Sequence, residues 1–386
     1  MAIDRVMPKL PAAHDHDVLL LEPRTPLPAA PAEPAAPATP ATPAETTVCQ
    51  QQHPHFPSLD GWRAIAIVLV LLTHLMPLGP QRWELNTSAG LAGMALFFCL
   101  SGFLVTNLLI DADNLGVFLV RRFFRIVPLA WLCLLIAFVL NPVAPQVWLP
   151  HFLFYANYPP KPLIAMTDHL WSLCVEVQFY LGIALVIVLC KRRGLVLLPL
   201  ACVLVTGLRV WQGAYFSVIT YLRVDEILVG GMLALVNRQV MVGTHHAAAI
   251  KRCICAVPFA LVLAAFLVSC SPLAKACDYA RPYLAMLLVG STLFAARNGR
   301  FAILDNKPLG YLATISFALY MIHPLLSHSW LGSGDLLEKY LKRPLLLLVL
   351  FVLAHLSTFH FERYAIRLGK RLCGHFSGVS KPAARP

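Results

Sequence analysis

Residues 62–79 read WRAIAIVLVLLTHLMPLG, an apolar run in which Arg63 and His74 are the ionisable residues. A transmembrane α-helix needs about 20 mainly apolar residues to cross the hydrocarbon core of a bilayer. The run is therefore predicted to be a membrane span. Residues eleven apart differ by about 20° around a helix, so Arg63 and His74 are expected on one face, with His74 about 16 Å deeper.

Apolar runs of similar length recur through the rest of the chain, and we expect ten spans. Their approximate ranges are 62–79, 91–110, 126–140, 172–190, 195–213, 219–237, 253–271, 280–297, 311–330 and 344–362. The chain of 386 residues is 58% hydrophobic and 13% charged, whereas a soluble protein carries about a quarter charged residues. This composition excludes a disordered protein, a coiled coil and almost any water-soluble enzyme. It predicts an all-α integral membrane protein with no extra soluble domain.

The net charge of +12 indicates how the spans are oriented. Lysines and arginines concentrate in alternate connections, as in the stretches 121–125 and 191–193, and at the C-terminal end. Cytoplasmic loops carry such an excess in membrane proteins. Both termini are therefore expected in the cytoplasm, which requires an even number of spans. The excess charge is expected to face anionic lipid rather than nucleic acid.

The chain divides into a tail and a membrane body. Residues 1–55 are rich in Pro and Ala and are predicted to be a disordered cytoplasmic tail. Residues 56–373 are predicted to form the membrane domain, and 374–386 a short basic tail. The 11 cysteines are scattered without metal-ligand spacing, so we interpret them as small apolar core residues and expect no metal site.

Several ionisable residues are expected inside the spans, where they are costly and often functional. Counted from the cytoplasmic end at 1.5 Å per residue, Glu176, Glu226 and His323 lie about 21, 16 and 18 Å deep. We expect these three residues and His74 to converge on a water-filled or substrate-filled cavity near mid-membrane. Taken singly, each could instead be a structural hydrogen-bond partner between helices.

A series of motifs along the chain then carries a family resemblance. In order they are SLDGWRAIA at 58–66, LFFCLSGFLVT at 96–106, RRFFRIVP at 121–128, WSLCVEVQFY at 171–180, RVDEILVG at 223–230, ISFALYMIH at 315–323 and FER at 361–363. The set resembles the acyltransferase-3 family, the multispanning bacterial membrane O-acyltransferases of surface polysaccharides. The resemblance covers about residues 56–373, essentially the whole membrane body.

The resemblance implies a donor, an acceptor and a location. The donor is acyl-CoA, expected to be acetyl-CoA, which is used as a substrate from the cytoplasm, and no permanently bound cofactor is expected. The acceptor is a sugar or lipid-linked sugar reached from the other side of the inner membrane. The family's arginine and histidine separated by ten residues match Arg63 and His74, and its paired arginines match Arg121 and Arg122.

The chemistry of acyl transfer assigns roles to these residues. A sugar hydroxyl needs a general base, for which a neutral imidazole is the usual group, and His74 is our candidate. Arginines suit the phosphates of CoA, so Arg63, Arg121 and Arg122 are expected to bind the donor. Glu176 is expected to orient His74 and to stabilise its imidazolium form.

Other polar residues are expected on the acceptor side of the site. Glu226, Arg223 and His323 would line it, and Trp171 would stack on a sugar ring. Glu362, at the end of the last span, could pair with Arg63. Direct transfer and an acyl-enzyme both stay open, with Ser101 and Ser172 as the candidate nucleophiles, although hydroxyls in spans often bond to backbone carbonyls.

Two other classes of protein remain open at this stage. A proton-coupled transporter or flippase of a sugar or lipid also buries His and Glu at mid-membrane. The sequence contains no internal repeat or matching pair of broken helices that would favour it. A receptor or scaffold could instead recruit a partner through the Pro-rich tail.

Overall fold

A computed structural model describes residues 56–112, 114–160, 162–295, 299 and 301–377 of the chain. The predicted N-terminal tail, residues 1–55, lies outside these residues, as does most of the predicted C-terminal tail. All regular secondary structure in the described part is helical, and no strand occurs there. The prediction of an all-α protein is confirmed.

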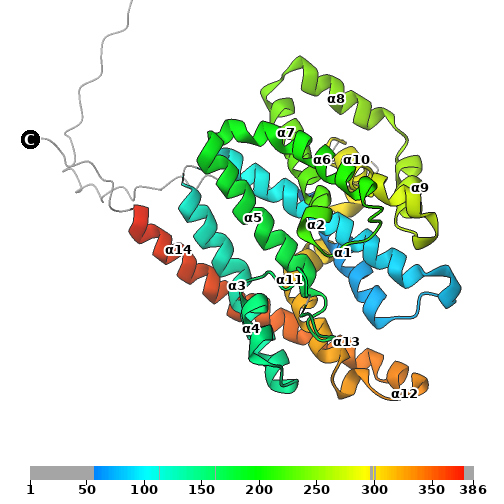
Figure 1. Cartoon of the computed structure of the whole chain (residues 1–386). Coiled ribbons are helices and arrows are strands. Elements are labelled where there is room, and N and C mark those ends of the chain that lie inside the picture. Colours follow the sequence, from blue (N-terminus) through cyan, green and yellow to red (C-terminus); the bar gives the residue numbers. More distant parts are fainter. Residues whose placement is uncertain (1–55, 113, 161, 296–298, 300, 378–386) are drawn as a thin grey trace, which may run out of the picture. The chain divides into compact units, whose positions relative to one another are not determined.

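Fourteen α-helices follow one another along the described part of the chain (Figure 1). They are α1 (Pro57–Leu75), α2 (Leu85–Asp111), α3 (Leu115–Leu140), α4 (Pro145–Phe152), α5 (Leu170–Cys190), α6 (Leu198–Trp211), α7 (Asp225–Val242), α8 (His245–Ala256), α9 (Phe259–Ser269), α10 (Arg281–Leu293), α11 (Lys307–Ser327), α12 (Leu336–Leu341), α13 (Arg343–Leu356) and α14 (Arg363–Ser377). A 3-10 segment, Lys191–Leu197, joins α5 to α6, and a π-helical segment, Ser357–Glu362, joins α13 to α14.

Six helical stretches of the described chain are long and apolar enough to cross a membrane, so the protein is a multi-pass membrane protein. They are α1, α2, α3, α11 and the composite stretches Leu170–Trp211 and Arg343–Gly374. Helices α8 and α9, bent by 79° at their junction, make a seventh if they count as one span. Each of the ten expected ranges overlaps a helix. The number of spans and the side of the termini stay predictions.

Helices α2 and α7 cross at backbone contact near the centre of the bundle. A Cβ added to Gly102 would lie 1.9 Å from the carbonyl oxygen of Ile227. A Cβ added to Gly230 would lie 1.9 Å from the carbonyl oxygen of Cys99. Helices in lipid associate through such close packing of small residues, because lipid tails are as apolar as the side chains. The crossing fixes the position of Ser101, which precedes Gly102.

Helices α1 and α11 run side by side in the same direction. Near the start of α1, Gly61 lies against Leu304, which precedes α11. Near the other end, the ring centroids of His74 and His323 are 5.2 Å apart. The parallel packing therefore places Arg63 toward one end of the bundle and His74 toward the opposite end.

Helix α14 lies along α3 (Figure 1). Gly369 allows the contact, since a Cβ at this position would lie 2.8 Å from Cβ of Phe124. Ala365 and Cys373 on the same face are buried, whereas Arg367 is exposed. The helix continues to Ser377, beyond the predicted end of the membrane domain at residue 373.

Candidate active site

The polar residues that were expected to converge belong to three separate clusters. His323 lies beside His74, Glu176 lies in a pocket with Arg63, and Glu226 is paired with arginines of a buried network. The expectation of one shared cavity is thus corrected. A depth along the membrane normal does not specify the rotation of a helix about its axis, so residues at one depth can face different neighbours.

The first cluster surrounds a cavity of about 120 Å³, which we call the arginine pocket. Helices α1, α2, α3, α5 and α11 and the π-helical segment contribute side chains to it. Its charged lining consists of Arg63, Arg122, Arg125, Glu176 and Glu362. The pocket therefore holds more positive than negative groups.

Glu176 is held inside the arginine pocket by two hydroxyl groups. Ser101 and Tyr180 both donate hydrogen bonds to its Oε1 atom. The guanidinium of Arg122 lies over the Tyr180 ring, 5.4 Å from its centroid. The charge of Glu176 also acts on Arg63. These contacts hold Glu176 in the arginine pocket, whereas His74 lines a different cavity, so they do not support the predicted role of Glu176 in orienting His74.

The arginines that line this pocket differ from the predicted set by one residue. Arg63 and Arg122 line it as expected, but Arg121 does not. Arg125 takes its place, since residues three apart on a helix share a face and adjacent residues differ by about 100°. The spacing of Arg122 and Arg125 in the RRFFR run is the signal that sequence reasoning missed.

Glu362 also lines the arginine pocket, as the last residue of the π-helical segment. Its Oε1 accepts a hydrogen bond of 2.9 Å from Thr358 Oγ1. Among the described residues no ion pair joins Glu362 to Arg63, although both side chains line the pocket together with Arg125. Segments of π-helix often mark functional sites, and this one adds a carboxylate to the pocket.

Tyr320 lies where the arginine pocket meets the second cluster. Its hydroxyl donates to the carbonyl oxygen of His169 at 2.5 Å and lies 2.6 Å from Ser172 Oγ. Its ring lies 5.3 Å from the His169 ring and 5.8 Å from the His323 ring. The same side chain thus lines the arginine pocket and contacts the histidines.

The second cluster consists of His74, His169 and His323, and we call it the histidine cluster. The rings of His169 and His323 are 5.5 Å apart. His323 Nδ1 lies 2.8 Å from the Tyr320 carbonyl. A carbonyl only accepts, so Nδ1 carries the proton and Nε2, which is buried without a hydrogen-bond partner, is free to accept one. Asp168 acts electrostatically on His74.

His169 was not among the residues selected from the sequence. It immediately precedes α5, and both of its ring nitrogens are buried without a hydrogen-bond partner. Burial, together with the nearby His323, His74 and His328, lowers the pKa of His169 well below its usual value. The ring is therefore neutral at pH 7. Its position directly before the WSLCVE motif was the available signal.

His74 also lines a second cavity of about 450 Å³, which we call the histidine pocket. The side-chain amide of Asn86 holds the end of α1 beside it, donating to the carbonyls of Met76 at 2.6 Å and Thr73 at 3.0 Å. The last carbonyls of a helix lack partners within the helix, so Asn86 fixes the turn that carries His74. The remaining polar lining is Thr73, Gln81, Glu84, Lys339, Tyr340 and Arg343.

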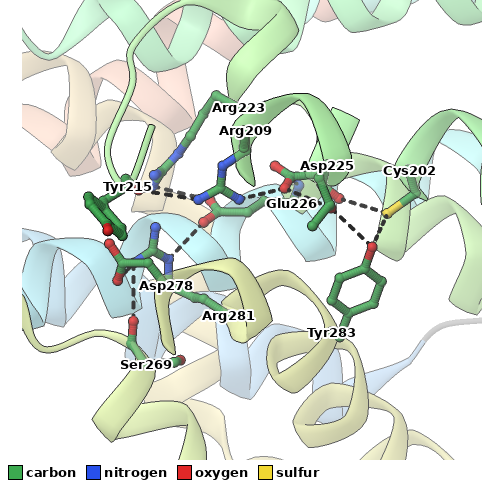
Figure 2. Close-up of polar contacts among 11 residues, drawn as sticks. Cys202, Arg209, Tyr215, Arg223, Asp225, Glu226, Ser269, Asp278, Arg281 and Tyr283 are labelled. Atoms are coloured by element: carbon green, nitrogen blue, oxygen red, sulfur yellow. Dashed lines mark hydrogen bonds and ion pairs between the residues drawn. The ribbon is translucent and has the colours of Figure 1, made fainter. Parts of the chain in front are cut away.

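The third cluster is a network of buried ion pairs (Figure 2). Glu226 pairs with Arg281 at 2.9 Å and with Arg223 at 3.2 Å. Arg281 also pairs with Asp278 at 2.9 Å, and Arg209 with Asp225 at 2.5 Å. Despite the arginine beside it, burial raises the pKa of Asp278. The three arginines and three carboxylates balance one another.

Trp171 packs against this network, and its stacking on a sugar stays a prediction. The guanidinium of Arg223 lies 5.5 Å from the centroid of the Trp171 ring. Phe98 and Phe216 pack against the same ring, at 5.8 and 6.1 Å between centroids. Trp171, Arg223 and Glu226 line neither of the pockets described above. Of the four residues expected on the acceptor side, His323 alone lies beside His74.

These features define a multi-pass helical membrane protein with an arginine pocket and a histidine cluster at opposite ends of one helix. The family model of the acyltransferase-3 family, described as an acyltransferase domain, matches residues 56–361. The chain belongs to this family, as the resemblance in its motifs implied. No solved structure matches it.

Similar curated proteins carry related names. The O-acetyltransferase OatA of Staphylococcus aureus (strain NCTC 8325 / PS 47) is 30% identical over 162 residues, which cover 36% of this chain and 26% of OatA. The peptidoglycan O-acetyltransferase OatA of Listeria monocytogenes serovar 1/2a is 28% identical over 155 residues, covering 33% of this chain and 23% of that protein. The chain thus spans about a quarter of the length of these relatives.

Proposed function

We propose that the protein is a membrane O-acyltransferase. It transfers an acyl group, an acetyl group in the simplest case, from cytoplasmic acyl-CoA to a hydroxyl of a cell-surface or lipid-linked sugar at the inner membrane. The observation that carries the proposal is the pairing of the arginine pocket with the histidine cluster, which Tyr320 joins. Membership of the family and the names of the relatives favour this reaction class over transport.

In this proposal the arginine pocket receives the donor. Guanidinium groups bind phosphate through two parallel hydrogen bonds, and Arg63, Arg122 and Arg125 offer three of them in one lining. Glu176 and Glu362 lie in the same lining and offset part of its positive charge. Phe97 and Phe317, on the apolar wall of the pocket, suit the pantetheine arm and its thioester.

The reaction itself takes place beside the histidine cluster. The acceptor oxygen attacks the thioester carbonyl carbon while the imidazole of His74 takes the hydroxyl proton. The new C–O bond forms, the C–S bond breaks, and the CoA thiolate leaves and recovers the proton from the imidazolium. Asp168 stabilises the imidazolium, because an opposite charge nearby favours the charged form. Asp168 thus takes the role first assigned to Glu176.

Acetyl transfer by the purified full chain in lipid nanodiscs tests the assignment of His74. Release of CoA and formation of the sugar ester are measured for the wild type, His74→Ala and His355→Ala. A general base contributes about 10²- to 10⁴-fold, so His74→Ala is expected to lose at least about a hundredfold in kcat. His355, an exposed histidine whose ring bonds to the Tyr311 hydroxyl, is the matched control and is expected to keep wild-type activity. Full activity of correctly folded His74→Ala would contradict the proposal.

A further inference from the structure

Arg343 is a buried cation in the lining of the histidine pocket. Its side chain is 4% exposed, and its Nε and Nη1 atoms are buried without a hydrogen-bond partner. Its guanidinium carbon lies 5.8 Å from the centroid of the Tyr340 ring. Arginines 209, 223 and 281 each have a carboxylate partner, whereas no ion pair among the described residues includes Arg343. An unpaired buried charge is strongly unfavourable.

The position of Arg343 at a helix start adds to this cost. It is the first residue of α13, and the preceding Lys342 provides no side-chain cap. The N-terminus of a helix carries a partial positive charge, which repels a cation and attracts an anion. The unpaired guanidinium and the helix N-terminus therefore both favour a negative group at the same place.

The other charged groups of the histidine pocket also favour a negatively charged ligand. Lys339 adds a second cation, and Glu84 is the acid among the described lining residues. The Glu84 carboxylate already accepts a hydrogen bond of 2.8 Å from Thr87 Oγ1. The positive charge of this pocket thus exceeds its negative charge, and His74 lines the same cavity of about 450 Å³.

We propose that Arg343, assisted by Lys339, binds an anionic group of the acceptor, a carboxylate or a phosphate, and so presents a neighbouring hydroxyl to His74. The guanidinium fork matches both kinds of oxyanion. The substrate class is then an acidic or phosphate-bearing sugar rather than a neutral one. This inference rests on the proposed acyl transfer, of which it specifies the acceptor.

Binding and turnover are measured separately with three probes on the full chain in nanodiscs. The probes are methyl glucuronoside, its neutral counterpart methyl glucoside, and glucose 1-phosphate. Ligand-dependent shifts of the thermal midpoint report binding, and ester formation from acetyl-CoA reports transfer. The variants are Arg343→Met, Arg343→Lys, His74→Ala and Lys342→Met. Lys342 pairs with Glu338 at 2.5 Å and does not line the pocket, so it is the matched control.

At least one anionic probe is expected to stabilise the wild type more than the neutral glucoside. Arg343→Met should weaken apparent binding of that probe at least about tenfold. Arg343→Lys should give an intermediate loss, because it keeps the charge without the fork. Lys342→Met and His74→Ala should keep anion binding. A thermal shift with glucose 1-phosphate alone identifies the anionic group of the acceptor as a phosphate. A thermal shift with methyl glucuronoside alone identifies it as a carboxylate.

Equal thermal shifts with anionic and neutral probes in the wild type would overturn the inference. This comparison uses the wild type alone, so it does not depend on the folding of any variant. If Arg343→Met weakened binding of the anionic and the neutral probes equally, the inference would also be overturned, since that pattern indicates a structural role of Arg343. Anion binding that depends on Arg343, without acyl transfer to any acceptor, would instead contradict the proposed function and leave the anion site intact.

Discussion

Single positions on α3 decide which arginines face the proposed donor. Arg121, Arg122 and Arg125 lie within five residues, but the pocket lining contains the second and third of them. The side chains of Arg121 and Arg125 are both exposed, but that of Arg121 does not line the pocket. The difference follows from rotation of about 100° per residue around the helix. Neighbouring arginines in one motif therefore have different expected roles.

Arg125→Gln and Arg121→Gln form a matched pair for testing this difference. Arg125→Gln is expected to raise the KM for acetyl-CoA about tenfold, because one charge-assisted hydrogen bond to phosphate contributes about 1.5–3 kcal/mol. Arg121→Gln should change the KM by less than about twofold, since its side chain does not line the pocket. Steady-state kinetics with acetyl-CoA as the varied substrate gives both values. A larger effect of Arg121→Gln would contradict the structural assignment.

At the scale of the elements, the crossing of α2 and α7 brings two helix backbones into direct contact. The two glycines let the backbones touch, and the same stretch of α2 carries Ser101 toward Glu176. Loss of the close approach would therefore disturb the arginine pocket as well as the packing of the bundle.

Gly102→Ala is expected to lower the free energy of unfolding by about 1–3 kcal/mol or more, as overpacking does in tight interfaces. Its new Cβ would meet the Ile227 carbonyl oxygen at 1.9 Å. Gly182→Ala on α5 is the control, since a Cβ there meets nothing within 4 Å. Thermal denaturation in detergent should show a lower midpoint for Gly102→Ala alone. Equal midpoints for the two variants would show that α2 and α7 can move apart without cost.

At the scale of the whole molecule, the buried ion-pair network joins segments that are distant in sequence. Glu226 at the start of α7 pairs with Arg281 at the start of α10 and with Arg223 before α7. Removing one member of a buried pair leaves the other charge without compensation, which costs about 3–5 kcal/mol. The network is therefore expected to stabilise the arrangement of these helices.

Glu226→Gln, which leaves the buried Arg223 without its carboxylate and Arg281 with Asp278 alone, should lower the thermal midpoint strongly. The control is Asp111→Asn, which removes a partly exposed pair with Arg238 at 3.1 Å and should cost about 0–1 kcal/mol. Acceptor KM measured on the folded fraction separates the two interpretations of Glu226. A raised KM with an unchanged midpoint would restore its role in acceptor binding.

The sequence by itself determined the helical membrane fold, the family motifs and the shared helix of Arg63 and His74, because apolar run length and helical periodicity are local properties. Tertiary structure alone decided which side chains meet. It brought His169 and His323 to His74, placed Glu176 in the arginine pocket and Glu226 in a buried network, and left Arg343 unpaired. These contacts depend on helix rotation and on packing between distant segments, which no local pattern specifies.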